Sequence, residues 1–105
     1  MTKPYVAHEE AVVGSFRKDP ELAADYLNAV LEDGSQEELM LALRRMATAF
    51  GMRDVAEMAN LNLNTLYRTL SSAGNPELKS FQAILGAMGL RLAVTPIEHP
   101  EHQSI

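Results

Sequence analysis

Residues 52–71 are MRDVAEMANLNLNTLYRTLS, two short segments with helical apolar spacing that meet near Asn60. Asparagine tolerates a left-handed backbone better than most non-glycine residues, so Asn60 favours a tight turn between two helices. Asn62 is a suitable N-cap for the second helix. The positions expected to be buried are Val55, Ala59, Leu66 and Leu70. Two short helices crossing over a tight turn predict a helix-turn-helix.

The second helix of such a pair has an outer face, whose first residues meet base edges in the major groove of DNA. Asn64 is suited to paired hydrogen bonds with adenine, and Arg68 to guanine or to a phosphate. Arg53, at the start of the first helix, is placed for a phosphate. The expected DNA-binding residues are Arg53, Asn62, Leu63, Asn64, Thr65, Tyr67, Arg68 and Ser71. The alternative is a helical bundle whose polar surface here is only solvated.

Capping signals predict three further helices around this segment. Asp19 followed by Pro20 starts a helix that Asp33-Gly34 ends, and Ser35 with Glu38 forms a capping-box pattern for the next, which Gly51 ends. Asn75-Pro76 repeats the cap-then-proline signal before the last helix, which Gly89 ends. Another short helix is expected from about Glu9 to Arg17. The prediction is an all-α fold with five helices in its main domain.

The last residues of the domain change to a period of two. Leu90, Leu92 and Val94 alternate with Arg91, Ala93 and Thr95, a pattern typical of a half-buried strand. A lone strand leaves backbone donors and acceptors unpaired, so we expect it to pair with the same strand of a second copy in a homodimer. The alternative is an extended tail that packs on the helices.

Length and composition set limits on the function. The 105 residues predict one domain over residues 19–95, an N-terminal arm with a short helix over 1–18 and a disordered tail over 96–105. There is no cysteine, and neither a signal peptide nor a membrane-spanning run is evident, so the expected location is the cytoplasm. The sequence contains no evident catalytic constellation or cofactor motif. A metal site is not expected either, because His99 and His102 lack a third ligand.

The charge is unevenly distributed along the chain. The net charge is −5, but residues 1–39 hold three basic and nine acidic side chains, whereas residues 40–95 hold six basic and three acidic ones. Basic side chains are needed to meet phosphate, and acidic ones suit a basic partner. The distribution therefore allows a basic DNA-binding part and an acidic N-terminal part that contacts another protein.

Several motifs together resemble those of a known family, the addiction-module antidotes, and in particular HigA-like antitoxins with a helix-turn-helix of the Xre/Cro type. The similarity covers roughly residues 15–95. It rests on these segments: Asp19-Pro20-Glu21, Tyr26 to Glu32, Ala42-Leu43-Arg44, Gly51-Met52, Leu66 to Ser71, Gly74-Asn75-Pro76 and Ala87 to Leu92. Two positions differ from the family pattern. Asn60 stands where glycine is usual, and Leu63 replaces a common arginine at the head of the second helix.

The resemblance implies an antitoxin that binds a RelE/HigB-like toxin, typically an mRNA-cleaving ribonuclease. It also implies a dimer that binds double-stranded operator DNA and represses its own operon. Two alternatives stay open: a stand-alone helix-turn-helix transcriptional regulator, and a protein-interaction module that has lost DNA binding. The low net charge and Leu63 favour the latter. An enzyme is not expected.

Overall fold

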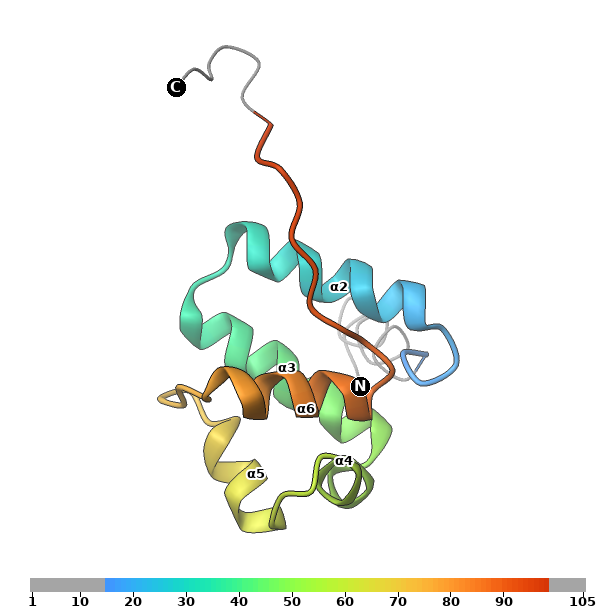
Figure 1. The fold of residues 1–105 in the computed structure, drawn as a ribbon, viewed down its shortest axis with the longest axis vertical. Coiled ribbons are helices and arrows are strands. Elements are labelled where there is room, and N and C mark those ends of the chain that lie inside the picture. The colour runs from blue at the N-terminus through green and yellow to red at the C-terminus, as the bar shows by residue number, and fades with distance from the viewer. Residues whose placement is uncertain (1–14, 99–105) are drawn as a thin grey trace, which may run out of the picture.

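The computed structural model describes residues 15–98, and their regular structure is five α-helices. These are α2 (Pro20–Asp33), α3 (Gln36–Phe50), α4 (Met52–Met58), α5 (Leu63–Thr69) and α6 (Leu78–Ala87). Helix α2 packs against α3, α3 packs against α4, and α4 packs against both α5 and α6. As a result α2 lies at one end of the molecule and the α4–α5 pair at the other (Figure 1). The predicted helical fold class is confirmed for these residues.

The two long helices begin at the predicted caps. The side chain of Asp19 accepts a hydrogen bond from the Leu22 amide at 3.1 Å, and Pro20 occupies the first turn of α2. At the start of α3, Ser35 Oγ accepts from the Glu38 amide at 3.2 Å while Glu38 Oε1 accepts from the Ser35 amide at 2.8 Å. These bonds satisfy amides that have no partner inside a helix, and one cap of this kind contributes about 1 kcal/mol.

A single apolar core joins all five helices. Its largest fully buried side chains are Phe16, Met40, Leu43, Met46, Val55, Leu66, Leu70, Ile84, Leu85 and Met88. Burying one such side chain contributes about 1.5–3 kcal/mol. Phe16 belongs to the turn before α2, and the centre of its ring lies 4.9 Å from the centre of the Tyr26 ring. Because the same core holds α4 and α5, the short helix pair sits on a packed support rather than depending on its own marginal helical stability.

The turn between α4 and α5 has the expected left-handed residue. Asn60 has a φ of 59°, the one positive value among the non-glycine residues that the structure describes. Its amide donates to the Glu57 carbonyl at 3.1 Å, and the Leu61 amide donates to the Ala56 carbonyl at 2.8 Å. This is the Schellman pattern that closes a helix and reverses the chain. The prediction of a turn at Asn60 and Leu61 is confirmed.

The last helix begins later than predicted. Helix α6 starts at Leu78 after Glu77, and Asn75 and Pro76 lie in the preceding loop rather than at the cap. A residue of α3 contacts this loop, since Gln36 Nε2 donates a hydrogen bond to the Gly74 carbonyl at 3.2 Å. A Cβ at Gly74 would collide with the Thr69 carbonyl oxygen, so glycine allows this close approach. The cap predicted at Asn75 was wrong, because the residue that precedes the helix is Glu77.

Other predictions fall at the edges of the described region. Residues 15–18 form a turn instead of the end of a helix, and the rest of the helix expected from Glu9 lies outside the described residues. The predicted arm over 1–18 and the tail over 96–105 fall largely on residues 1–14 and 99–105, which also lie outside.

The C-terminal strand is not confirmed. Residues 90–98 have no regular secondary structure and run past α2 (Figure 1). A strand is defined by hydrogen bonds to a neighbour, and the described part of this single chain has no second extended segment to offer them. Pairing of residues 90–95 with a second copy therefore stays a prediction.

The left-handed turn gives a prediction about stability. The substitution Asn60→Val should lower the free energy of unfolding by about 1–2 kcal/mol, because a β-branched side chain is strained at positive φ. The substitution Asn60→Gly should leave it nearly unchanged, and since Asn60 is exposed, lost packing does not complicate the comparison. Urea denaturation of both variants measures the difference. Equal stability of Asn60→Val and Asn60→Gly would contradict the role given to this turn.

Candidate nucleic-acid interface

Helix α5 presents the two side chains on which the expected DNA contact depends. Asn64 and Arg68 are both exposed, and they lie one helical turn apart on the same side of the helix. The opposite side carries Leu66, which is buried, and Leu70 immediately after the helix is buried as well. The structure therefore brings Asn64 and Arg68 together on an outer surface, with the packed core behind them.

Asn62 acts as the N-cap of α5. Its Oδ1 accepts a hydrogen bond from the Asn64 amide at 2.8 Å, as the sequence predicted. The same bond fixes where α5 begins, and with it the direction in which Asn64 leaves the backbone. Asn62 thus positions the head of the helix, and the contact with DNA that was also expected of it stays a prediction.

Three of the expected contact residues are less exposed than the sequence suggested. Leu63 is half-buried and packs against the core, and Thr65 and Ser71 are half-buried too. The hydroxyl of Ser71 donates to the Arg68 carbonyl at 2.9 Å, so it closes the end of α5. The exposed surface of α5 is consequently narrower than predicted and centres on Asn64, Tyr67 and Arg68.

A contact between α3 and α5 escaped the sequence analysis. The Arg44 guanidinium carbon lies 5.0 Å from the centre of the Tyr67 ring, which is a cation–π geometry. Tyr67 is 41% exposed, so the ring and the charge stand at the surface rather than in the core. In the sequence, Arg44 stands out only as part of the motif Ala42-Leu43-Arg44. The two residues are 23 positions apart, and no local pattern indicates that they meet.

Basic and acidic side chains both lie on the helix-turn-helix. Arg53 on α4 is exposed, as expected for a phosphate contact, and so is Arg68 on α5, while Arg44 contacts Tyr67 from α3; α4 also carries the exposed acids Asp54 and Glu57. The neighbouring Asp54 is paired with Arg17 at 3.5 Å, with both side chains more than half exposed. An exposed pair of this kind adds little stability, but it offsets a negative charge at the start of α4. A hollow of about 380 Å³ lies beside Arg68, lined by the loop that follows α5.

In the part of the chain that the structure describes, no group of three histidine, cysteine, aspartate or glutamate side chains has the arrangement to hold a metal ion. None of the described helices has the length and apolar character needed to cross a membrane.

Comparison with known proteins agrees with the motifs in the sequence. A family model described as "Probable addiction module antidote protein" matches residues 10–96. A Haemophilus influenzae protein, named only "Uncharacterized protein", is 32% identical over 69 residues, which is 66% of this chain and 71% of that protein. No solved structure was found to match. Because the family model covers most of its length, the chain belongs to the family of probable addiction module antidote proteins, which implies a toxin of some kind as its partner.

Proposed function

We propose that this chain is the HigA-like antitoxin of a type II toxin–antitoxin system. It acts in the cytoplasm, binds operator DNA as a dimer, represses its own operon and neutralises a RelE/HigB-like toxin. The DNA-binding part of the proposal rests on the exposed pair Asn64 and Arg68 on α5, the helix that follows the left-handed turn at Asn60. Membership of an antidote family supports the toxin-binding part.

In this proposal α5 is the recognition helix of an Xre/Cro-type helix-turn-helix. Asn64, in its first turn, pairs with an adenine in the major groove, and Arg68 reads a guanine or holds a phosphate. Arg53 at the head of α4 and Arg44 beside Tyr67 add phosphate contacts, which carry no sequence information but fix the register. A two-fold dimer would place two copies of α5 about 34 Å apart, in successive major grooves of a palindromic site.

A protein-interaction module without DNA binding is the second candidate. It is favoured by the net charge of −5 and by Leu63, which packs on the core at a position where a basic residue would strengthen DNA binding. A stand-alone regulator that binds DNA but no toxin is the third. Binding to the DNA upstream of its own gene, measured across a salt series, separates the second candidate from the other two, because phosphate contacts make affinity fall as salt rises.

Arg68 provides the sharpest test of the DNA-binding surface. Replacing Arg68 with Ala should weaken binding to the upstream DNA by about 1–3 kcal/mol, because one base or phosphate contact is lost. The measurement is a fluorescence-anisotropy titration with the full chain and a labelled duplex.

Lys18 supplies the matched control for that titration. It is also exposed, in the turn before α2, so Lys18→Ala removes one positive charge away from α5. Equal losses for the two variants would mean that only net charge matters. No loss for Arg68→Ala would remove α5 from the DNA contact.

The dimer gives a separate prediction. Replacing Ala93 with Pro removes a backbone donor in the middle of residues 90–95, so it should convert a dimer into a monomer. Ala93 is exposed in a segment without regular structure, so the single chain should fold as before. Sedimentation equilibrium measures the change, with Ala93→Thr as a control that keeps the donor. Unchanged dimerisation of the proline variant would show that the copies associate elsewhere.

A further inference from the structure

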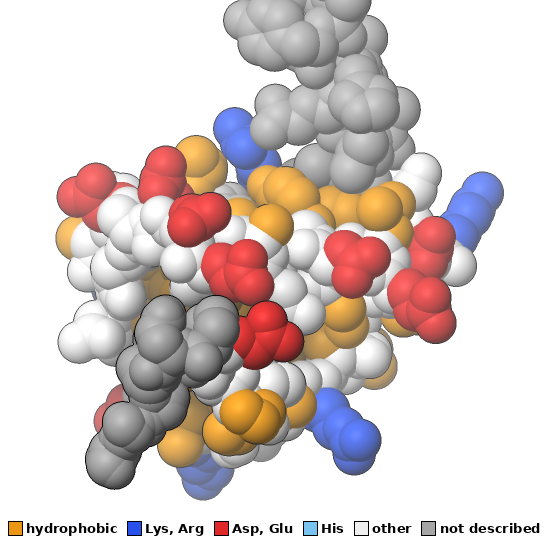
Figure 2. All heavy atoms as spheres, turned by 90° about the horizontal axis from the view of Figure 1, so that it is seen from above, with side chains coloured by type: hydrophobic (Ala, Val, Ile, Leu, Met, Phe, Trp, Pro, Cys, Tyr) orange, Lys and Arg blue, Asp and Glu red, His pale blue; other side chains and the backbone are white. Residues whose placement is uncertain are grey.

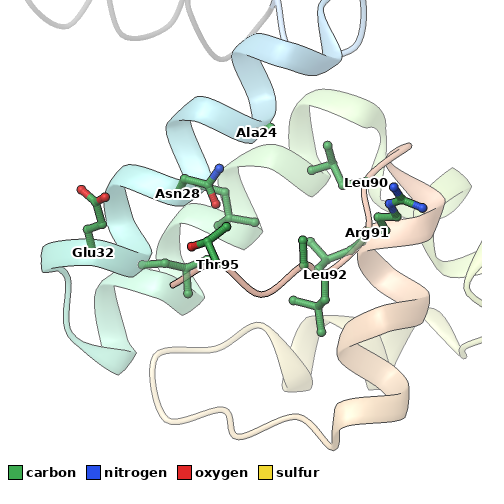
Figure 3. A pocket seen from close by; sticks show the side chains of 11 residues that line it. Ala24, Asn28, Glu32, Leu90, Arg91, Leu92 and Thr95 are labelled. Atoms are coloured by element: carbon green, nitrogen blue, oxygen red, sulfur yellow. The ribbon is translucent and has the colours of Figure 1, made fainter. Parts of the chain in front are cut away.

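A groove of about 460 Å³ runs between α2 and the segment that follows α6. Its α2 wall includes Leu27 and Leu31, and its other wall includes Leu90 and Leu92 (Figure 3). Leu31 is 48% exposed and Leu92 37% exposed, so apolar surface is open to solvent on both walls. Beyond the groove, Val94 and Ile97 are strongly exposed. Apolar surface concentrated in this way is a common mark of a protein–protein contact.

The helix that forms one wall of the groove is acidic. Helix α2 contains no lysine or arginine, and its exposed acidic residues Glu21, Asp25 and Glu32 follow at helical spacing along one stripe, opposite the buried Ala23 and Leu27. Seen from above, acidic side chains spread along the face over α2 next to hydrophobic ones (Figure 2). Glu32 lines the groove itself, at the end away from Arg91 (Figure 3). An apolar groove beside an acidic stripe is complementary to an apolar anchor flanked by lysine or arginine.

We infer that this groove is where the antidote binds its toxin, through a basic segment of the toxin. An apolar side chain of that segment enters between Leu31 and Leu92, and its lysine or arginine residues face Asp25 and Glu32. This inference rests on the antidote function proposed above and adds the surface and the chemistry of the partner. Complementary charge steers the encounter, and the buried apolar anchor supplies most of the affinity.

The fold makes other occupants less suitable. A second copy that filled the groove would bring two acidic α2 stripes together, and like charges oppose such a contact. The dimer proposed above differs from this, because it pairs the backbones of residues 90–95 and leaves the groove between α2 and that segment open. The acidic stripe on α2 also opposes the approach of DNA phosphates. The groove lies beside α2, and α2 is at the end of the molecule away from α4 and α5 (Figure 1). The toxin and the operator can therefore be bound by one chain at the same time.

The role of the acidic stripe is tested by measuring how fast the full chain associates with the purified product of the reading frame adjacent to its gene. The double variant Asp25→Asn/Glu32→Gln should reduce the association rate by about tenfold at low salt and make that rate less dependent on salt. The matched control Glu57→Gln/Glu77→Gln removes the same charge from exposed positions outside α2 and should change the rate little. Equal effects of the two double variants would overturn the role of the α2 stripe.

The apolar part uses two exposed leucines. Leu31→Ser should weaken the complex by about tenfold or more, whereas Leu78→Ser, at a 64% exposed leucine on α6, should leave it unchanged. Circular dichroism and binding to the upstream DNA establish that each variant is folded. Loss of a homodimer in Leu31→Ser with no change in toxin affinity would assign the groove to a second copy and overturn the inference.

The outcome for the wild-type chain separates this inference from the function on which it rests. If wild-type protein forms no complex with the adjacent gene product, the antitoxin proposal fails at this locus and the inference fails with it. If the complex forms but tolerates the Asp25/Glu32 and Leu31 variants, the antitoxin proposal stands and only the groove is rejected.

Discussion

The geometry of the candidate interface depends on a short backbone reversal at Asn60. Two hydrogen bonds, from Asn60 to Glu57 and from Leu61 to Ala56, close α4, and the next residue, Asn62, caps α5. Without the left-handed φ at Asn60, α4 would continue in its own direction, and Asn64 and Arg68 would not be presented as they are. The strain of one residue is small, and the buried side chains on both sides of the turn, among them Val55 and Leu66, hold it in place.

The arrangement of the helices separates an acidic surface from one of mixed charge. Helix α2 carries acidic side chains without a basic one, whereas α4 and α5 carry Arg53 and Arg68 together with Asp54 and Glu57, and Arg44 contacts α5 from α3. The common core fixes the distance between the two surfaces, because α3 contacts both α2 and α4. A net charge of −5 therefore says little about what either end binds, since interactions between exposed charges more than about 8 Å apart are largely screened at physiological salt. This separation is what an antidote would need to hold a toxin and an operator together.

Local signals predicted the parts of the fold that local physics controls. The caps at Asp19, Ser35 and Asn62 and the left-handed turn at Asn60 each depend on residues no more than a few positions away, and the structure contains all of them. The cap expected at Asn75 is not formed, and the loop that contains this residue is contacted by a distant one, since Gln36 donates a hydrogen bond to Gly74. The expected strand at 90–95 needs a partner that the sequence of one chain cannot provide.

The candidate interface was predicted less completely than the fold. Exposure of Asn64 and Arg68 follows from helical periodicity, because the buried positions of α5 fix the opposite face. The half-burial of Leu63 and the pairing of Arg44 with Tyr67 depend on how α3 packs near α5, which periodicity within one helix does not determine. The groove beside α2 is likewise formed by segments far apart in the sequence. The helical pattern of α2 and the alternating pattern of residues 90–95 do not by themselves indicate it.

The most direct test of the central claim is a map of which backbone amides respond to DNA. In a ¹⁵N NMR titration of the full chain with the duplex upstream of its gene, the account predicts that shift changes concentrate on residues 62–71 and at Arg53, while α2 is unaffected. Changes concentrated on α2 or residues 90–97, or no saturable change at any residue, would contradict it.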